Sequence, residues 1–600
     1  MHFWGNLHIR ASGPVNLPRQ MPNPRLCLCS QAMHPQHAQR LAADIVGEFG
    51  NGGAANQLHG LASLGTSGSY KVERDLHSWL RGAFDLHLMP CHVKIKALDQ
   101  DGRPCEVDHP ILKPVEVVQQ MSAAGLGVLK ECMLGARGDV AMREYWEHSN
   151  DFDWFREHPH KPPEHMRCKS IPVWIHGDCA RAFNMQKILI LSWMSGLMSG
   201  CSWSSRMLFT VIPADDLPDL TLQSLLGHFA DEINALQEST SLPYRFVYAG
   251  SKGDLEWHAV AYQMVRYYRC NLLCYRCFAS QTQSDLLWTD LSDDAPWTRT
   301  TVRTGDFLNN YTTAPSLCKI HGWSADTLLW DMMHVLFLGI GPDLCGSAML
   351  LLVVTNYFSN SNNVDDHLAL MHQRFKVWRT KHRVHVYVDK FTHKKLKCPQ
   401  ERSRCNQYKG WPELDCKAAH VKCTIFFLAD LFYVASVLPQ QEIKDAASCL
   451  HALAEFIWVL SRADFWLLPW EADSAMFHGM KFLVIYRHLA QAAENARTSR
   501  WRTRPKTHYY HHALKFMQHT KMNVLKSTCF LDEDFMGKVK RLASKTHRSL
   551  VSVRTLQRYV ILLGCRWRRL RKSVGLHAAH RERRLHAARE ARARSCNVPL

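Results

Sequence analysis

The sequence lacks an uninterrupted run of about 20 apolar residues, the length that a helix needs to cross a bilayer. Its two most apolar stretches are both broken, because residues 334–354 contain Gly-Ile-Gly-Pro-Asp343 and residues 423–438 are shorter and contain Asp430. The opening residues also lack the apolar segment of a secretory signal. We therefore expect an intracellular protein that buries both stretches as core helices and has no membrane partner.

Acidic residues are scarce relative to basic ones. The 54 Asp and Glu against 73 Lys and Arg leave a net charge of +19 and a pI near 9.1, which favours a polyanionic partner such as DNA. Nearly half of this surplus lies in residues 566–600, which hold eleven Lys or Arg and two Glu. Neither a zinc-finger spacing nor a helix-turn-helix pattern is recognisable. We expect the tail to contact phosphates without reading sequence.

Repeats are also lacking at spacings of about 20–50 residues, which argues against a solenoid. What the chain does have is 46% hydrophobic residues over 600 positions, enough for several domains with a sizeable interior. Without a recognisable secretory signal, its 21 cysteines are expected to be reduced thiols, some of them binding metal.

The pair Cys274-x-x-Cys277 has the spacing of a zinc knuckle. Two later pairs could supply the missing ligands, namely Cys318 with His321 and Asp331 with His334. The first pair offers the softer donors and is the better set for zinc. Two alternatives stay open: the cysteines are free thiols in a buried turn, and the Asp–His pair is hydrogen-bonded in the core.

An α/β core is predicted from residue 166 onward. The apolar runs of four predicted strands cover residues 171–178, 188–193, 207–212 and 245–249. Residues 220–236, between the third and fourth runs, have the apolar spacing of a helix. Three antiparallel strands, a helix and a fourth strand form the opening half of a ribonuclease H-like sheet. That fold uses an acid at the end of its first strand and another after its fourth, where Asp178 and Asp254 stand.

Acids in these places suit phosphodiester cleavage. Two Mg²⁺ or Mn²⁺ ions about 3.5–4 Å apart can stabilise the attacking and the leaving oxygen. Such hard cations require oxygen ligands, so carboxylates from distant parts of the chain must converge. A single Asp could equally be structural or solvated, and only the combination with the strand order predicts a metal site.

Three features together resemble the DDE transposases of eukaryotic cut-and-paste elements, most closely the CACTA and KDZ group. They are Gly-Asp178, Asp254 about twenty residues ahead of the Cys-x-x-Cys pair, and Asp331-Met-Met-His334-Val-Leu-Phe-Leu-Gly339. The resemblance covers residues 150–570. It implies metal-dependent DNA cleavage and strand transfer, transposon ends and target DNA as partners, a homodimer and a nuclear location.

The same resemblance implies a third acid, usually Glu on a late helix. Cys529-Phe-Leu-Asp-Glu533-Asp-Phe-Met-Gly537 is similar to that helix, and Arg504-Pro-Lys-Thr-His508 is similar to a family segment ahead of it. The match selects Glu533 over its two acidic neighbours, with Glu413 as a rival. The expected DNA contacts follow on this helix and the tail: Lys538, Lys540, Arg541, Lys545, Arg566, Arg568 and Arg569.

The expected fold is therefore α/β, an RNase H-like mixed sheet core with a large, mostly helical insertion and a mixed N-terminal region. The expected division is a poorly structured segment (1–69), a small α/β accessory region with a linker (70–165), the first part of the core (166–280), the insertion with a possible metal knuckle (281–500), the second part of the core with the third acid (501–565) and the basic tail (566–600). The competing interpretation is a catalytically silent, domesticated transposase relative that binds DNA or protein.

Overall fold

A computed structural model describes residues 72–595, together with Gln39 and Ser63. Within this range it leaves out residues 85, 136, 184, 185, 199, 216 and 545, and side chains are described no further than Ser573. The segment expected to be poorly structured (1–69) and the expected DNA contact Lys545 therefore lie outside the described residues, Gln39 and Ser63 apart.

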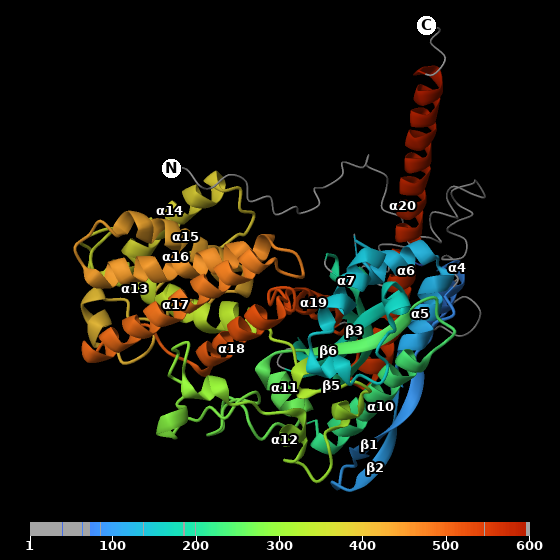
Figure 1. Cartoon of the computed structure of the whole chain (residues 1–600). Coiled ribbons are helices and arrows are strands. Elements are labelled where there is room, and N and C mark those ends of the chain that lie inside the picture. Colours follow the sequence, from blue (N-terminus) through green and yellow to red (C-terminus); the bar gives the residue numbers. More distant parts are fainter. Residues whose placement is uncertain are drawn as a thin grey trace. The chain divides into compact units, whose positions relative to one another are not determined.

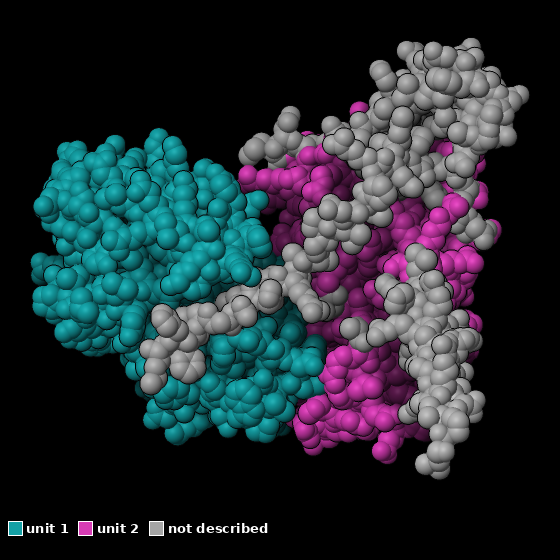
Figure 2. Space-filling view, turned by 90° about the horizontal axis from the view of Figure 1, so that it is seen from above, with its two compact units in different colours: residues 1–14, 252–312, 328–530 teal, residues 15–251, 313–327, 531–600 magenta. Residues whose placement is uncertain are grey.

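The chain forms two compact units (Figure 2). Unit 1 comprises Lys252–Thr312 and Leu328–Phe530, and its regular elements are helices. Unit 2 comprises Thr313–Thr327 and the described parts of Val15–Ser251 and Leu531–Leu600, and it holds the sheets. The expected mixed α/β class is confirmed. The units divide the chain at other positions than those expected, because 252–280 and 501–530 belong to the helical unit.

Unit 2 combines two sheets with covering helices. Its elements, in chain order, are α4 (Val72–Phe84), β1 (Cys91–Leu98), β2 (Pro104–Ile111), α5 (Pro114–Ala123), α6 (Leu126–Met133), α7 (Asp139–Ser149), α8 (Asp153–Arg156), β3 (Ser170–Phe183), β4 (Gln186–Ser195), α9 (Ser202–Ser205), β5 (Arg206–Pro213), α10 (Asp219–Glu238), β6 (Arg245–Lys252), α19 (Phe530–Ala543) and α20 (Val551–Ser595). Figure 1 shows their course.

The four predicted core strands are confirmed as one sheet with the order β5-β4-β3-β6. Its inner strands are buried on both faces, since eight consecutive residues of β4 are buried, and this explains their continuous apolar sequence. The end predicted for the first strand was wrong. Asp178 pairs with Ile190 of β4, and β3 continues beyond it to Phe183.

Helices α10 and α20 are both anchored to β5. The predicted apolar face of α10 is buried, and its Phe229 stacks on Phe209 of β5 with ring centroids 4.4 Å apart. From α20, the hydroxyl of Tyr559 accepts from the Leu208 amide and donates to the Arg206 carbonyl, both at 3.1 Å. Helix α20 runs unbroken through residue 566, so the predicted tail begins inside a helix that is part of unit 2.

Unit 1 is built from helices. They are α11 (Leu255–Ala261), α12 (Thr304–Leu308), the π-helix η6 (Met333–Ile340), α13 (Gly341–Val354), α14 (Val364–Lys381), α15 (Ala418–Ala435), α16 (Gln441–Arg462), α17 (Pro469–Asn495) and α18 (Pro505–Thr520). Short 3₁₀ turns lie between several of them. Some of the helices pack closely, as Gly479 of α17 does against Leu514 of α18. A Cβ on Gly479 would lie 2.4 Å from a Leu514 methyl group.

Two helical stretches of unit 1 are long and apolar enough to cross a membrane, Met333–Val354 and Ala418–Ala435. The first is 89% buried inside the protein and the second 56% buried. Burial of this kind is typical of core helices, and the expectation of no membrane partner stays a prediction.

The buried ion pair of Arg206 and Asp532 gives a stability prediction for unit 2. The Arg206 Nε atom lies 2.9 Å from Asp532 Oδ1, with side chains 4% and 0% exposed. Asp532→Asn leaves a buried guanidinium uncompensated, so we expect the free energy of unfolding to fall by about 3–5 kcal/mol in denaturant titrations. Glu401→Gln breaks an exposed pair with Arg404 and should cost at most about 1 kcal/mol. Equal losses would contradict this account.

Candidate metal centre and carboxylate site

Two cysteines and two histidines of unit 1 form a group suited to a metal ion. Cys274 and Cys277 lie in the irregular segment after α11, and His508 and His512 lie on α18. A spacing of four residues places both imidazoles on one face of that helix. The four ligand atoms all lie within 4.8 Å of one another, and three of the four residues are buried.

The distances within this group fit a tetrahedral zinc site. The Sγ atom of Cys277 lies 3.4 Å from His508 Nε2 and 3.2 Å from His512 Nε2, and Cys274 Sγ lies 3.5 Å from His512 Nε2. Zinc bonds of about 2.3 Å to sulfur and 2.0–2.1 Å to nitrogen give tetrahedral edges of about 3.5 Å between sulfur and nitrogen. The residues present therefore fit zinc in distance and in donor type.

Electrostatics prepare the same group for a cation. Burial raises the pKa of the Cys274 thiol, but the hydrogen bond from Cys277 and the charges of His512 and His508 outweigh burial, so this pKa lies well below its usual value. Burial and the neighbouring Cys274 raise the pKa of Cys277. Burial lowers the pKa of His508, and the nearby Cys274 opposes this shift.

Backbone amides and aromatic rings hold the ligands in place. The amide of Arg276 donates to Cys274 Sγ at 3.3 Å, and the amide of Ala279 donates to Cys277 Sγ at 3.4 Å. Trp297 packs against the His508 ring at 4.1 Å between centroids, and Trp330 stacks on His512 at 5.7 Å. Such contacts orient ligands and exclude water from the site.

The structure groups the cysteine pair with other residues than the predicted partners. Cys318 and His321 belong to unit 2, and Asp331 with His334 forms a pair of its own. Sequence reasoning missed the two histidines of α18 as ligands, although their spacing of four residues on a helix was an available signal. That signal could not identify the cysteines, because 231 residues separate Cys277 from His508.

Asp331 acts as a structural acceptor. His334 Nδ1 donates to its Oδ2 at 2.5 Å, and the amides of Met333 and Cys529 both donate to its Oδ1 at 2.9 Å. Burial raises the pKa of Asp331, but the hydrogen bond and charge of His334 and the two amides outweigh it, so the pKa lies below its usual value. These contacts support the alternative of a hydrogen-bonded core pair.

The π-helix η6 that follows lies against Lys506, another residue that sequence reasoning missed. A Cβ on Gly339 would stand 2.4 Å from Lys506 Cδ, so glycine is needed for the close approach of α18. Burial lowers the pKa of Lys506, and the nearby carboxylates of Asp254 and Asp331 oppose this shift. Its amine thus lies in the electrostatic field of two acids of unit 1.

Asp254 occupies the start of α11. Its Oδ1 accepts from the Trp257 amide at 2.6 Å, which makes it the N-cap. Gly253 before it has φ +159, and a Cβ there would lie 2.1 Å from the Trp257 ring. The turn between β6 and α11 therefore fixes both the backbone and the carboxylate of Asp254.

The other two predicted acids belong to unit 2. Asp178 is half-buried on β3, and the Cys179 amide donates to its Oδ1 at 2.6 Å. Glu533 is half-buried in the first turn of α19. Of its acidic neighbours, Asp532 pairs with Arg206, and Asp534 accepts from Ser202 and Lys538 at 2.6 Å each. Both neighbours of Glu533 therefore have structural contacts, and Glu533 stays the predicted third acid.

The rival Glu413 is committed to an ion-pair network in unit 1. One nitrogen of Arg504, Nη2, donates to Glu413 Oε2 and to Asp343 Oδ1 at 2.7 Å each. Lys397 Nζ lies 3.2 Å from the other oxygen of Glu413. Glu413 therefore has a structural role.

One hydrogen bond brings together the two segments that lead to Asp254 and Glu533. Lys252 Nζ donates to the Thr528 carbonyl at 3.0 Å. Asp254 follows two residues after Lys252, and Glu533 follows five residues after Thr528. The amide of Cys529, in the same late segment, donates to Asp331, so three predicted motifs meet at this point of unit 1.

The predicted DNA contacts differ in their surroundings. Lys538 donates to Ser202 and Asp534, and Arg566 donates to Ser204. Lys540 is half-buried, whereas Arg541, Arg568 and Arg569 are exposed.

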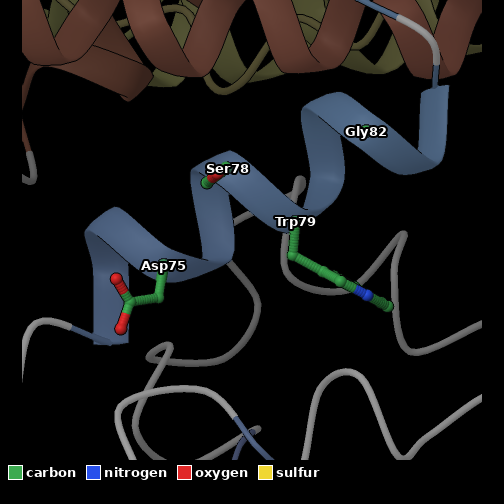
Figure 3. Close-up of a pocket in the computed structure, with 4 residues that line it drawn as sticks. All are labelled: Asp75, Ser78, Trp79 and Gly82. Carbon is green, nitrogen blue, oxygen red and sulfur yellow. The ribbon is translucent and has the colours of Figure 1, made fainter. Parts of the chain in front are cut away.

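The pocket in Figure 3 lies along α4 and is lined by Asp75, Ser78, Trp79 and Gly82. These residues belong to one helix and include a single titratable side chain. The pocket contains none of the predicted site residues.

No known protein family matches the chain, and no curated protein is significantly similar to it.

Substituting single ligands should distinguish the Cys₂His₂ group found in the structure from the ligand set predicted from the sequence. We expect Cys277→Ser and His512→Ala to abolish the thiolate-to-cobalt charge-transfer absorption that Co²⁺ gives when it replaces zinc between cysteines. Cys318→Ser should keep this absorption at full intensity, because Cys318 is not part of the group. Loss of the absorption in Cys318→Ser, or its survival in Cys277→Ser, would contradict the assignment.

Proposed function

We propose that this chain is a metal-dependent enzyme of the DDE transposase type, which cleaves DNA strands and joins them to a target, on an RNase H-like sheet. One observation supports the proposal, namely the place of β6 in the sheet. Strand β6 lies beside β3, which holds Asp178. Its last residue, Lys252, lies two positions before Asp254 and is hydrogen-bonded to Thr528, in the segment that leads to Glu533.

The three carboxylates provide the oxygen ligands that hard cations need. When bound, two Mg²⁺ or Mn²⁺ ions supply charge stabilisation for the attacking and leaving oxygens of an in-line displacement. The chain itself orients the ligands, because the Trp257 amide holds Asp254 and the first turn of α19 holds Glu533. Lys506, whose pKa is lowered by burial and raised by the charge of Asp254, would supply positive charge to a phosphate oxygen.

Zinc in the Cys₂His₂ group has a structural role in this proposal. Cys274 and Cys277 with His508 and His512 would hold the ion, which would fix α18, the helix that carries Lys506, to the segment that follows Asp254. A closed set of four protein ligands without an open position is typical of structural zinc. The group therefore supports the carboxylate site by holding two of its segments together.

The partners in this proposal are transposon ends and target DNA. The net charge of +19 supports a polyanionic substrate, and the exposed arginines of α20 would contact phosphates. A nuclear location and a homodimer that holds two DNA ends follow from the same proposal.

A cleavage assay tests the catalytic part. With Mn²⁺ and duplex DNA, we expect Asp178→Ala, Asp254→Ala and Glu533→Gln each to lower the rate of strand cleavage by more than about 100-fold, since each removes a ligand of the reacting centre. The matched control Asp534→Asn should keep cleavage at the level of the unmodified chain.

Folding of each variant is checked by circular dichroism and by the cobalt absorption of the Cys₂His₂ group. Cleavage that persists in a folded Asp178→Ala protein would refute the assignment. Full DNA binding without cleavage in the unmodified chain would favour the catalytically silent DNA-binding protein instead.

The salt dependence of DNA binding tests the tail. Each phosphate contact contributes a slope of about −0.9 to the plot of log K against log salt, so Arg568→Ala with Arg569→Ala should flatten the slope by up to about 2. The exposed Arg404 of unit 1 serves as the control, and its replacement by Ala should leave the slope unchanged. An unchanged slope in the double variant would show that these two arginines of the tail do not contact DNA phosphates.

A further inference from the structure

We propose that His160, Glu238 and His321 form a second metal site, in unit 2, which takes a divalent transition-metal ion such as Zn²⁺. One ligand atom from each lies within 4.8 Å of the others. His160 follows α8, Glu238 is the last residue of α10, and His321 follows a short 3₁₀ turn at Ser316–Lys319. The inference is independent of the proposed DNA chemistry.

The distances fit a single ion. His321 Nδ1 lies 3.1 Å from His160 Nε2 and 3.4 Å from Glu238 Oε1. Bonds of about 2.0–2.2 Å from zinc to nitrogen and oxygen give tetrahedral edges of about 3.3 Å. Both measured distances lie within about 0.2 Å of that value.

Hydrogen bonds alone cannot pair all the polar atoms of these three side chains. His321 Nδ1 carries either one proton or one lone pair, yet it faces two groups. If protonated, it can donate to the carboxylate or to His160, and if unprotonated, it accepts from His160 while its lone pair faces the carboxylate. A cation between the three groups satisfies two imidazole lone pairs and one carboxylate oxygen at once.

The helix that supplies Glu238 also fixes the backbone of His321. Asn234 of α10 accepts from the His321 amide at 2.8 Å and donates to the Lys319 carbonyl at 3.1 Å. Gln237 donates to the His321 carbonyl at 3.1 Å. Helix α10 thus carries Glu238 and holds the backbone of His321 before any ion binds. Such preorganisation lowers the entropic cost of coordination.

The third ligand is fixed through its neighbour His158. The His160 amide donates to His158 Nδ1 at 3.0 Å, and His158 Nε2 donates to the Tyr248 carbonyl at 3.1 Å. Gly322, with φ +87, packs closely against the His158 ring. A Cβ at this position would lie 1.8 Å from His158 Nε2, so only glycine allows the contact.

The surroundings indicate an accessible site. The side chains of His321 and Glu238 are 43% and 56% exposed, and three protein ligands leave a coordination position for water. Glu238 offsets the positive charge of an ion, whereas the charge of the nearby Arg245 opposes it. We therefore expect weaker and faster-exchanging binding than in the buried Cys₂His₂ group.

A bound ion would connect the segment Thr313–Thr327 to the rest of unit 2. Thr313–Thr327 belongs to unit 2, although the chain before and after it belongs to unit 1. His321 lies in this short segment, and the other two ligands lie in the main body of unit 2. Metal binding would therefore stabilise the attachment of the segment to α10.

Counting bound zinc in the full-length protein by equilibrium dialysis tests the site. We expect the unmodified chain to bind one more equivalent than Glu238→Gln or His321→Ala, or to bind it at least about 10-fold more tightly. His228→Ala, on the same helix but hydrogen-bonded to the Lys94 carbonyl, should retain this equivalent. Glu238 is exposed at a helix end, so its substitution by Gln should leave the fold intact.

Cobalt separates the two sites. The extra equivalent should add ligand-field absorption without thiolate charge transfer, and Cys277→Ser should keep it. Zinc should also slow proteolysis within Thr313–Thr327 in the unmodified chain and not in His321→Ala. Equal zinc stoichiometry and affinity in the unmodified chain and Glu238→Gln would overturn the proposal.

Discussion

The two ends of a long helical insert must meet, and this constraint organises the molecule. Apart from the passage Thr313–Thr327, unit 1 contains the chain from Lys252 to Phe530, and the hydrogen bond from Lys252 to Thr528 joins these two ends. Closing so long a loop costs about 5 kcal/mol of chain entropy. A structural zinc site, with an apparent binding free energy of about 10–16 kcal/mol, could offset this cost. The Cys₂His₂ group lies where it can do so, because Cys274 and Cys277 follow the first end and His508 and His512 precede the second.

The positions of the predicted acids in the chain follow from the same meeting of the two ends. Asp254 caps the first helix after the chain enters unit 1, and Glu533 lies in the first turn after it leaves. Asp331, an acid between them in sequence, binds the backbone of the late segment through the Cys529 amide. Its role is thus to hold the exit of the insert in place, while the proposed metal ligands are the acids at the two ends.

The two candidate metal groups differ in the chemistry of their donors. Cys₂His₂ is buried, soft and closed, so it suits a permanent structural ion. The His₂Glu group is exposed and offers one hard donor with two imidazoles, so it suits an exchangeable ion. Each joins segments that are distant in sequence, and in unit 2 the joined segment is the short passage Thr313–Thr327.

Local patterns of the sequence predicted the strands and helices of the sheet. The apolar runs that begin at Ile171, Ile188, Met207 and Arg245 all form strands, and the spacing from Leu222 to Leu236 gives the buried face of α10. Such patterns succeed because burial imposes a period on neighbouring residues. They failed at strand ends, since Asp178 is followed by five more strand residues whose pairing with β4 depends on the partner strand.

The sequence by itself determined the α/β class, the four core strands, the Cys-x-x-Cys pair and the acids worth testing. Only the tertiary structure decided which histidines complete the cysteine pair, that Asp331 with His334 is a structural pair, that Glu413 belongs to Arg504, and that His321 lies with His160 and Glu238. The physical reason is that ligand sets and ion pairs are contacts in space. Their members are separated by tens to hundreds of residues, and no local spacing records which distant side chain the fold brings to them.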